Sequence, residues 1–273
     1  MKNKYLSLIA IVMAWVLVTS CTVVPITGRK QMNLLPEATM LEMGLTSYKA
    51  FLDTIDLSKN LPSTASVEKV GRNISTVVNS FLKANGQESR LPYFQWEFRL
   101  VADKTPNAWC LPGGKVVFYE GILPITKNES GIAVVMGHEI AHAVARHGNE
   151  RMSQSLVTEL GGMALSVAIQ TQPAQTQQIF QVAYGLGSQI GVLLPYSRLH
   201  EKEADRLGLI FMAMAKYDPN EAISFWERMK EINSGNQVPE WLSTHPLDEN
   251  RIAEMKKNLP EAMKYYQDAT ELK

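Results

Sequence analysis

Two stretches in the first third of the chain carry apolar residues every three to four positions, which is the spacing of one helix face. The first runs from Pro36 to about Leu52. The second runs from about Ser66 to Lys83 and ends before the polar pair Asn85-Gly86. After Tyr119 almost all of the remaining sequence shows helical spacing. We therefore expect a mostly helical protein.

A strand pattern interrupts the helices. From Phe94 to Val101 every second residue is large and apolar, which predicts a strand. Two short apolar runs follow, 107–111 and 115–119, with Pro112-Gly113-Gly114 between them. A Pro-Gly-Gly sequence between such runs is typical of a turn, so we expect a β-hairpin here. The expected fold class is α+β, mostly helical, with a small sheet or hairpin.

The first twenty residues have the pattern of a targeting segment. Lys2 and Lys4 precede an apolar run, Tyr5 to Val18, which has the length of a signal-peptide core and is short for a membrane span. Small residues then precede Cys21, as in a bacterial lipobox. We interpret residues 1–20 as a lipoprotein signal peptide and Cys21 as the lipidation site. An ordinary secretory signal that contains a Cys is the alternative.

The domain expectations follow from this interpretation. Residues 21–35, with Pro25 and Gly28, would form a lipid-anchored linker, and residues 36–273 would form a single domain. No internal repeat is visible. Thr22 after the Cys resembles the sorting signal of enteric lipoproteins, which implies a bacterial outer membrane and the side that faces the periplasm.

Composition excludes several classes of protein. The chain has 27 basic and 27 acidic residues, and the lack of net positive charge argues against a nucleic-acid partner. An apolar fraction of 45% is ordinary for a chain with a buried core. Two Cys cannot make a disulfide scaffold. If Cys21 carries lipid, Cys110 has no partner within the chain, and we expect a small buried residue there rather than a reactive thiol.

The chemistry is concentrated in the H-E-x-x-H sequence from His138 to His142. It lies in an expected helix that Asn128 can cap and Gly148 can end. The two His lie about 40° apart around a helix, so both imidazoles can reach one metal ion. Glu139 lies beside them, where its carboxylate can take a proton from the water that the metal activates without being a ligand itself.

A catalytic zinc ion needs a third protein ligand and an open position. The spacing of metzincins would place a His at Gly148, and His147 is one residue off, so we interpret His147 as a helix C-terminal residue. The alternative is a Glu from a second helix. Glu201 and Asp205 share a helix face, so Glu201 could bind zinc while Asp205 accepts the outer N–H of a ligand His. His200 is expected to be exposed.

These sequences resemble metallopeptidase family forty-eight, which includes HtpX-like, Oma-like and BepA-like zinc peptidases. Residues 197–208 are similar to its SRxxExEADxxG signature, and residues 107–114 are similar to its NAFALPGG segment. Trp109 replaces a Phe there, and Cys110 replaces a small residue. The likeness covers about Leu91 to Arg251. The lipobox and the lack of a repeat domain are similar to the small periplasmic lipoprotein members.

The resemblance implies a gluzincin-like core with an active-site helix, a glutamate-bearing helix and a sheet whose edge strand binds substrate backbone. Asn107, Ala108 and Trp109 are the strand candidates, unless the hairpin only packs under the active-site helix. In BepA-like members a His in a segment like Thr244-His245-Pro246 can be a fourth zinc ligand. His245 would then hold the enzyme latent or stabilise the oxyanion, unless it is a loop residue. Arg251 could hold a Glu or a substrate carbonyl, or lie on a helix surface.

The resulting hypothesis is an endopeptidase with one zinc ion per chain and Glu139 as the general base. By the resemblance, it would hydrolyse unfolded or misassembled cell-envelope proteins, with attachment to the membrane through Cys21 and no nucleic acid bound. The alternative is a latent zinc lipoprotein that acts mainly as a chaperone or assembly factor. The sequence does not identify the substrates, the partner proteins or the oligomeric state.

Overall fold

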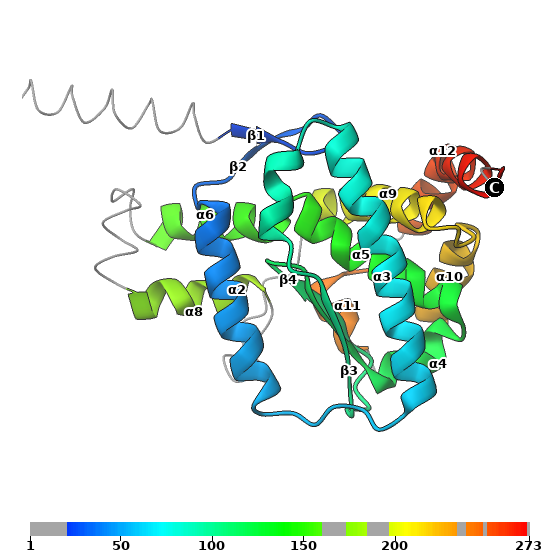
Figure 1. The fold of residues 1–273 in the computed structure, drawn as a ribbon, viewed down its shortest axis with the longest axis horizontal. Helices are drawn as coiled ribbons and strands as arrows, with labels where there is room; N and C mark the ends of the chain where they lie inside the picture. Colours follow the sequence, from blue (N-terminus) through cyan, green and yellow to red (C-terminus); the bar gives the residue numbers. More distant parts are fainter. Residues whose placement is uncertain (1–20, 160–172, 185–196, 234–238, 248–249, 272–273) are drawn as a thin grey trace, which may run out of the picture.

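The computed structural model describes residues 21–159, 173–184, 197–233, 239–247 and 250–271. The predicted signal peptide, residues 1–20, lies outside them. The described helices are α2 (Glu37–Leu52), α3 (Leu61–Ala84), α4 (Leu123–Thr126), α5 (Glu129–Val144), α6 (His147–Glu159), α8 (Pro173–Ala183), α9 (Arg198–Met214), α10 (Glu221–Asn233), α11 (Glu240–Thr244) and α12 (Arg251–Glu271). Helices surround a small sheet (Figure 1), which confirms the expected fold class.

The main sheet contains β3 (Glu97–Val101), β5 (Lys115–Tyr119) and β4 (Ala108–Leu111), in that order. β5 pairs antiparallel with β4, so the expected hairpin is present, and it pairs parallel with β3. β3 begins at Glu97 rather than Phe94, because a 3₁₀ helix occupies Glu88–Tyr93. In this sheet β4 pairs with β5 only, so its other edge has no strand partner among the described residues.

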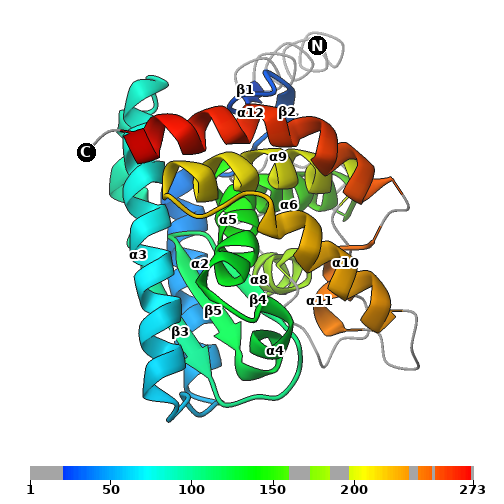
Figure 2. The same ribbon diagram turned by 90° about the vertical axis from the view of Figure 1, so that its right-hand side faces the viewer.

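Helix α5 lies at the centre of the fold. In Figure 2, α12, α9 and α5 lie in this order from top to bottom above the sheet, and α3 runs along one flank of α9, α5 and the sheet. The main core fills the space between α3, α5, α9 and the sheet, and its buried side chains include Ile74, Phe118, Val135, Met136 and Phe211. Burial of apolar side chains of this size is the dominant favourable contribution to folding.

Two glycines set how closely α5 and α9 approach. A Cβ on Gly137 would lie 2.8 Å from the carbonyl oxygen of Gly208. A Cβ on Gly208 would lie 2.9 Å from the backbone nitrogen of His138. Both distances are shorter than van der Waals contact, so side chains are excluded at this crossing. The close approach brings the polar face of α9 against the two His of α5.

The N-terminal segment differs from the linker that the sequence predicts. β1 (Cys21–Val23) and β2 (Lys30–Met32) form an antiparallel pair, and the side chain of Gln31 donates to the carbonyl of Ala145, just after α5, at 2.7 Å. Leu35 is buried in a small cluster with α6 and α8. The lipidation of Cys21 stays a prediction. No helix in the described ranges combines the length and hydropathy that a membrane span requires.

Candidate metal centre

α5 presents the two His of the H-E-x-x-H sequence on one buried face. The helix begins where the side chain of Asn128 accepts a hydrogen bond from Gly131 N at 2.9 Å, as predicted. It ends at Val144, before Gly148. Ile140 and Val144 pack into the core and fix the orientation of the helix. The Nε2 atoms of His138 and His142 lie 3.0 Å apart, so both face the same point.

α9 brings two carboxylates to that point. Ser197 caps the helix by accepting from His200 N at 3.2 Å. Glu201 Oε1 lies 3.2 Å from His142 Nε2, and Glu201 Oε2 lies 3.5 Å from His138 Nε2. One helical turn later, Asp205 Oδ1 lies 3.0 Å from the other ring nitrogen of His138. Glu201 therefore faces the inner nitrogens, and Asp205 faces an outer one, as the i, i+4 spacing predicts.

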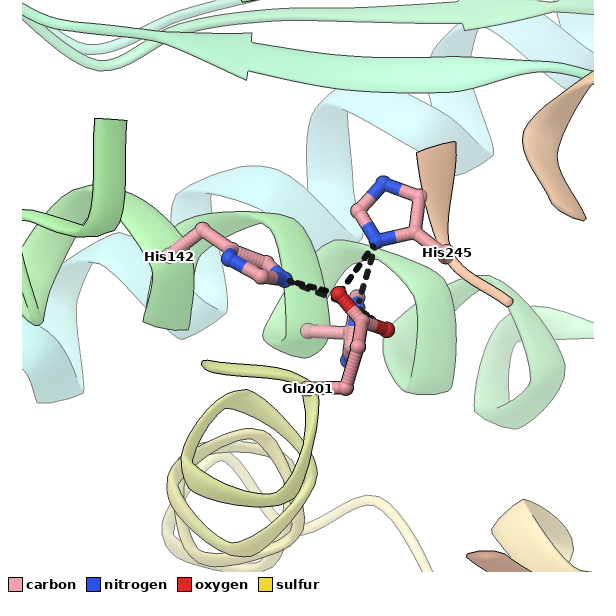
Figure 3. A group of neighbouring side chains, drawn as sticks. His142, Glu201 and His245 are labelled. Carbon is pink, nitrogen blue, oxygen red and sulfur yellow. Dashed lines mark hydrogen bonds and ion pairs between the residues drawn. The ribbon is translucent and has the colours of Figure 1, made fainter. Parts of the chain in front are cut away.

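His245, which follows α11, completes the group. Its Nδ1 lies 3.1 Å from His138 Nε2 and 3.0 Å from Glu201 Oε1, and its side chain is buried. Figure 3 shows His245 and His142 on either side of the Glu201 carboxylate. One atom from each of His138, His142, Glu201 and His245 lies within 4.8 Å of all the others. Since His245 faces this group, it is not a residue of a surface loop.

The donor set fits a small divalent ion. Three imidazole nitrogens and a carboxylate oxygen are typical zinc ligands, at about 2.0–2.2 Å from the ion in a tetrahedral arrangement. Ligand atoms at such distances lie about 3.3 Å from one another. The separations of 3.0–3.5 Å measured between these residues are of that size. With His245 turned away, three ligands and an open position would remain.

Charge and burial set the protonation of the ligands. Burial disfavours imidazolium, but the carboxylates of Glu201 and Asp205 outweigh it and raise the pKa of His138 to about 9. At His142 burial dominates and holds its pKa well below the usual range. Burial would raise the pKa of Glu201, but Arg251 and the neighbouring His hold it well below its usual range. Metal binding at neutral pH must therefore displace the proton of His138.

The affinity for zinc is expected to rise with pH. Below pH 9 His138 carries a proton in the metal-free protein, and one proton must leave when the ion binds. The affinity should increase by about tenfold per pH unit from pH 7 toward pH 9. Competition with a chelator of known pH dependence measures this. Asp205→Asn removes one of the two carboxylates and should shift the rise to lower pH; an affinity that is constant over this range would contradict the assignment.

Glu139 lies beside the ligand group at the end of a cavity. Trp241 Nε1 donates to Glu139 Oε1 at 2.7 Å, and His245 Nε2 lies 3.3 Å from the same oxygen. The same cavity is lined by Asn107, Ala108 and Trp109 of the β4 edge, and by Cys110. Burial raises the pKa of the Cys110 thiol, which is the behaviour expected of a buried structural Cys. The predicted base and the predicted substrate strand therefore share one cavity.

The sequence interpretation was wrong for two of the His. His147 begins α6, is fully buried, and lies 3.0 Å from His142, Nδ1 to Nδ1. It is thus a partner of a ligand rather than a helix C-terminal residue. His200 is also buried, and its Nε2 lies 2.9 Å from Glu150 Oε2. Glu203, the second Glu of the signature, lies 3.1 Å from His147 Nε2 through its Oε2. A second Glu two residues after Glu201 was the feature of the sequence that could have pointed to a partner such as His147.

Arg251 and Trp241 are the other functional candidates that the structure singles out. Arg251 Nε donates to Asp205 Oδ2 at 2.7 Å, and Arg251 Nη1 lies 2.8 Å from Glu201 Oε2. The guanidinium carbon lies 3.7 Å from the centre of the Trp226 ring. Arg251 is buried and contacts Glu201, which was one of the three alternatives that the sequence left open for it. Trp241 carried no motif and was missed.

The chain is similar to known metallopeptidases. The model of Peptidase family M48 matches residues 69–259. Mitochondrial metalloendopeptidase OMA1 of Schizosaccharomyces pombe is 36% identical over 244 residues, 88% of this chain and 66% of that protein. The protein of the same name in Saccharomyces cerevisiae is 34% identical and covers 90% of this chain and 71% of its own. Beta-barrel assembly-enhancing protease of Yersinia pestis is 30% identical over 66% of this chain and 37% of its own.

The relatives correct the predicted location. Proteins that match most of this chain in two yeasts, and others in cattle and human, are named as mitochondrial. The expectation of a location at a bacterial outer membrane is therefore wrong. It depended on the segment that ends at Cys21 and on Thr22 after it, and these residues lie before the matched family region. The chain spans 66% of the S. pombe relative and about half of the human one.

Proposed function

The chain belongs to Peptidase family M48 and is a metallopeptidase, and from this premise we propose that it is a zinc-dependent endopeptidase of unfolded or misassembled polypeptides. The observation that carries the proposal is the ligand group of His138, His142, Glu201 and His245 with Glu139 beside it. This arrangement has the ligands and the base that peptide hydrolysis with zinc needs. The cavity that Glu139 lines is also lined by residues of β4, which is an edge strand of the described sheet.

The strand edge supports an extended polypeptide as the substrate. Residues 107–109 lie at the start of β4, whose second edge has no partner strand in the described sheet. A polypeptide that adds to this edge gains main-chain hydrogen bonds, which depend little on its side chains. A folded protein has few main-chain groups free for such pairing. Selection of unfolded polypeptides would follow from this geometry.

Each residue of the site would have a separate role in peptide hydrolysis. His138, His142 and Glu201 would hold zinc, and a bound zinc ion would supply the Lewis acidity that lowers the pKa of water to about 7 and polarises the scissile carbonyl. Glu139 would take the proton from the attacking water and pass it to the leaving amine. Trp241 orients Glu139 through its 2.7 Å hydrogen bond. Asp205 contacts Nδ1 of His138 and would fix the ring so that Nε2 faces the other candidate ligands.

Cleavage of an unfolded model protein tests this function. The zinc-loaded chain should cut the unfolded protein internally and leave its native form intact, and mass spectrometry of the products identifies the cut bonds. A chelator should abolish cleavage, and added zinc should restore it. Release of single terminal residues would instead identify an exopeptidase. Activity that is unaffected by metal removal would contradict the mechanism.

His245 supports a second candidate, a latent zinc protein with a chaperone or assembly role. Its Nδ1 lies among the donor atoms, so it could occupy the fourth position and exclude water. We expect His245→Ala to raise hydrolysis by about tenfold or more, because an open minor state often has a population of only 0.1–10%. Thr244→Ala is the neighbouring control. A lower rate with zinc retained would make His245 an oxyanion donor, and inactivity of both the wild type and His245→Ala would favour the chaperone role.

A further inference from the structure

A continuous chain of polar contacts leads from the N-terminal strand pair to the candidate ligand His142. It runs from Arg29 through Glu203 and His147. We propose that Arg29 is a positioning residue for the metal centre and that the segment from β1 to β2 is a structural part of that centre. The proposal rests on the proposed metal site and adds a group more than a hundred residues away in sequence.

Arg29 holds two acidic side chains at once. Its Nε lies 3.0 Å from both carboxylate oxygens of Glu203. Its Nη1 and Nη2 donate to Glu150 at 2.8 and 2.7 Å. Thr27 Oγ1 adds a hydrogen bond to Glu203 Oε1 at 2.7 Å. A planar guanidinium can bridge two carboxylates in this forked geometry, whereas a lysine ammonium cannot.

From Glu203 the contacts continue through His147 to His142, and one set of proton positions on the two rings satisfies both hydrogen bonds. His142 faces the ligand group through Nε2, so in its neutral form the proton is on Nδ1. That N–H can donate to His147 Nδ1, which lies 3.0 Å away. The proton of His147 is then on Nε2, from which it donates to Glu203 Oε2 at 3.1 Å. Outer contacts of this kind set the ring orientation and basicity of a metal-binding His.

The charges of the cluster explain why Arg29 is needed. Glu150 and Glu203 are buried side chains of the same charge, and the guanidinium of Arg29 lies between them. Without it, the two carboxylates would repel each other in a poorly solvated site. Glu203 would then turn away from Glu150 toward solvent, and this movement would weaken its hydrogen bond with His147. The orientation of His142 would lose its support.

The segment that carries Arg29 is itself held against the active-site helices. Gln31 donates to the carbonyl of Ala145, which caps α5. Leu34 N donates to Ser153 Oγ at 2.9 Å, and Asn149 Nδ2 donates to Leu35 O at 2.8 Å, both on α6. Arg29 therefore reaches Glu203 from a fixed backbone, so its contribution to the orientation of His142 does not require ordering of a free arm.

Zinc affinity measures this contribution directly. In the full chain, Arg29→Ala should weaken zinc binding about tenfold, since loss of an outer contact typically costs 10–100-fold in metal affinity. The visible spectrum of the cobalt-loaded protein should also change, which a merely structural role would not cause. Arg206→Ala is the matched control, because Arg206 makes a similar forked pair with Glu261 from α9. It should change the affinity less than about twofold.

Three further variants separate the outcomes. His142→Ala should lose zinc; if it does not, the proposed metal site itself is wrong. His147→Ala should weaken zinc binding at least as much as Arg29→Ala. If His142→Ala loses zinc while Arg29→Ala binds it as wild type does, only the role of Arg29 is overturned. Thermal unfolding of the metal-free protein shows whether Arg29→Ala folds. If it does not, Arg29→Lys is measured instead, because it keeps the positive charge but lacks the forked guanidinium, and its zinc affinity should also be weaker than that of the wild type.

Discussion

Replacement of Glu139 by Gln is expected to abolish peptide hydrolysis while the protein keeps its zinc. Glu139 is not within the ligand group, so the metal should stay. The Gln carbonyl can still accept from Trp241, so the side chain should keep its place. An amide cannot take the proton of the attacking water, and loss of a general base costs about 10²–10⁴-fold in rate. The measurements are kcat/KM on an unfolded model protein and the zinc content of the same sample.

Glu129→Gln is a matched control for this variant. Glu129 lies in the first turn of the same helix and pairs with Lys69 on the surface, at 2.8 Å. Its replacement should leave both zinc content and rate close to wild type. Turnover at the wild-type rate by zinc-loaded Glu139→Gln would remove Glu139 from the mechanism. Loss of zinc from that variant would instead show that Glu139 helps to hold the metal.

Replacement of Arg251 by Ala should destabilise the metal-free protein by about 3–5 kcal/mol, which is the usual cost of removing one partner of a buried ion pair. The guanidinium contacts Asp205 and Glu201, and all three side chains are buried. Its removal would take away the positive charge that both carboxylates contact and leave a cavity in a buried site. Urea unfolding of the metal-free protein measures the loss. Added zinc should recover part of it, because the ion brings positive charge to Glu201.

Arg72→Ala gives the reference for a surface ion pair. Arg72 is exposed and pairs with Glu68 one helical turn away, at 3.2 Å. Pairs of this kind contribute about 0.3–0.5 kcal/mol. If Arg251→Ala cost no more than Arg72→Ala, the buried contacts of Arg251 would not stabilise the fold. If zinc failed to recover any stability, Glu201 would not be a ligand.

The part of the site that the sequence predicts is local. The two His of α5 lie one turn apart, and so do Glu201 and Asp205 on α9, so helix geometry alone places each pair on one face. The hairpin is equally local, because Pro112-Gly113-Gly114 determines where β4 turns into β5. A spacing within one element needs no knowledge of how the elements pack.

The remaining residues reach the site only through packing. His245 and Trp241 belong to α11 and the turn after it, about a hundred residues beyond α5, and no periodicity relates the two regions. Arg29 belongs to a segment whose strands are three residues long, too short for an alternating pattern to be visible. His147 was misassigned because the break between α5 and α6 comes before Gly148, where a cap was expected.

The crossing of α5 and α9 at Gly137 and Gly208 also sets the separation between the candidate ligands of the two helices. A zinc site is recognised by ligand distances within about 0.2 Å of their usual values, so this separation matters for a site built from both helices. A methyl group at either glycine would force the helices apart, because it would meet backbone atoms at 2.8–2.9 Å. The wider spacing would move His138 and His142 away from Glu201. Two positions with no side chain thus keep the ligands of the two helices together, although neither glycine is in the ligand group.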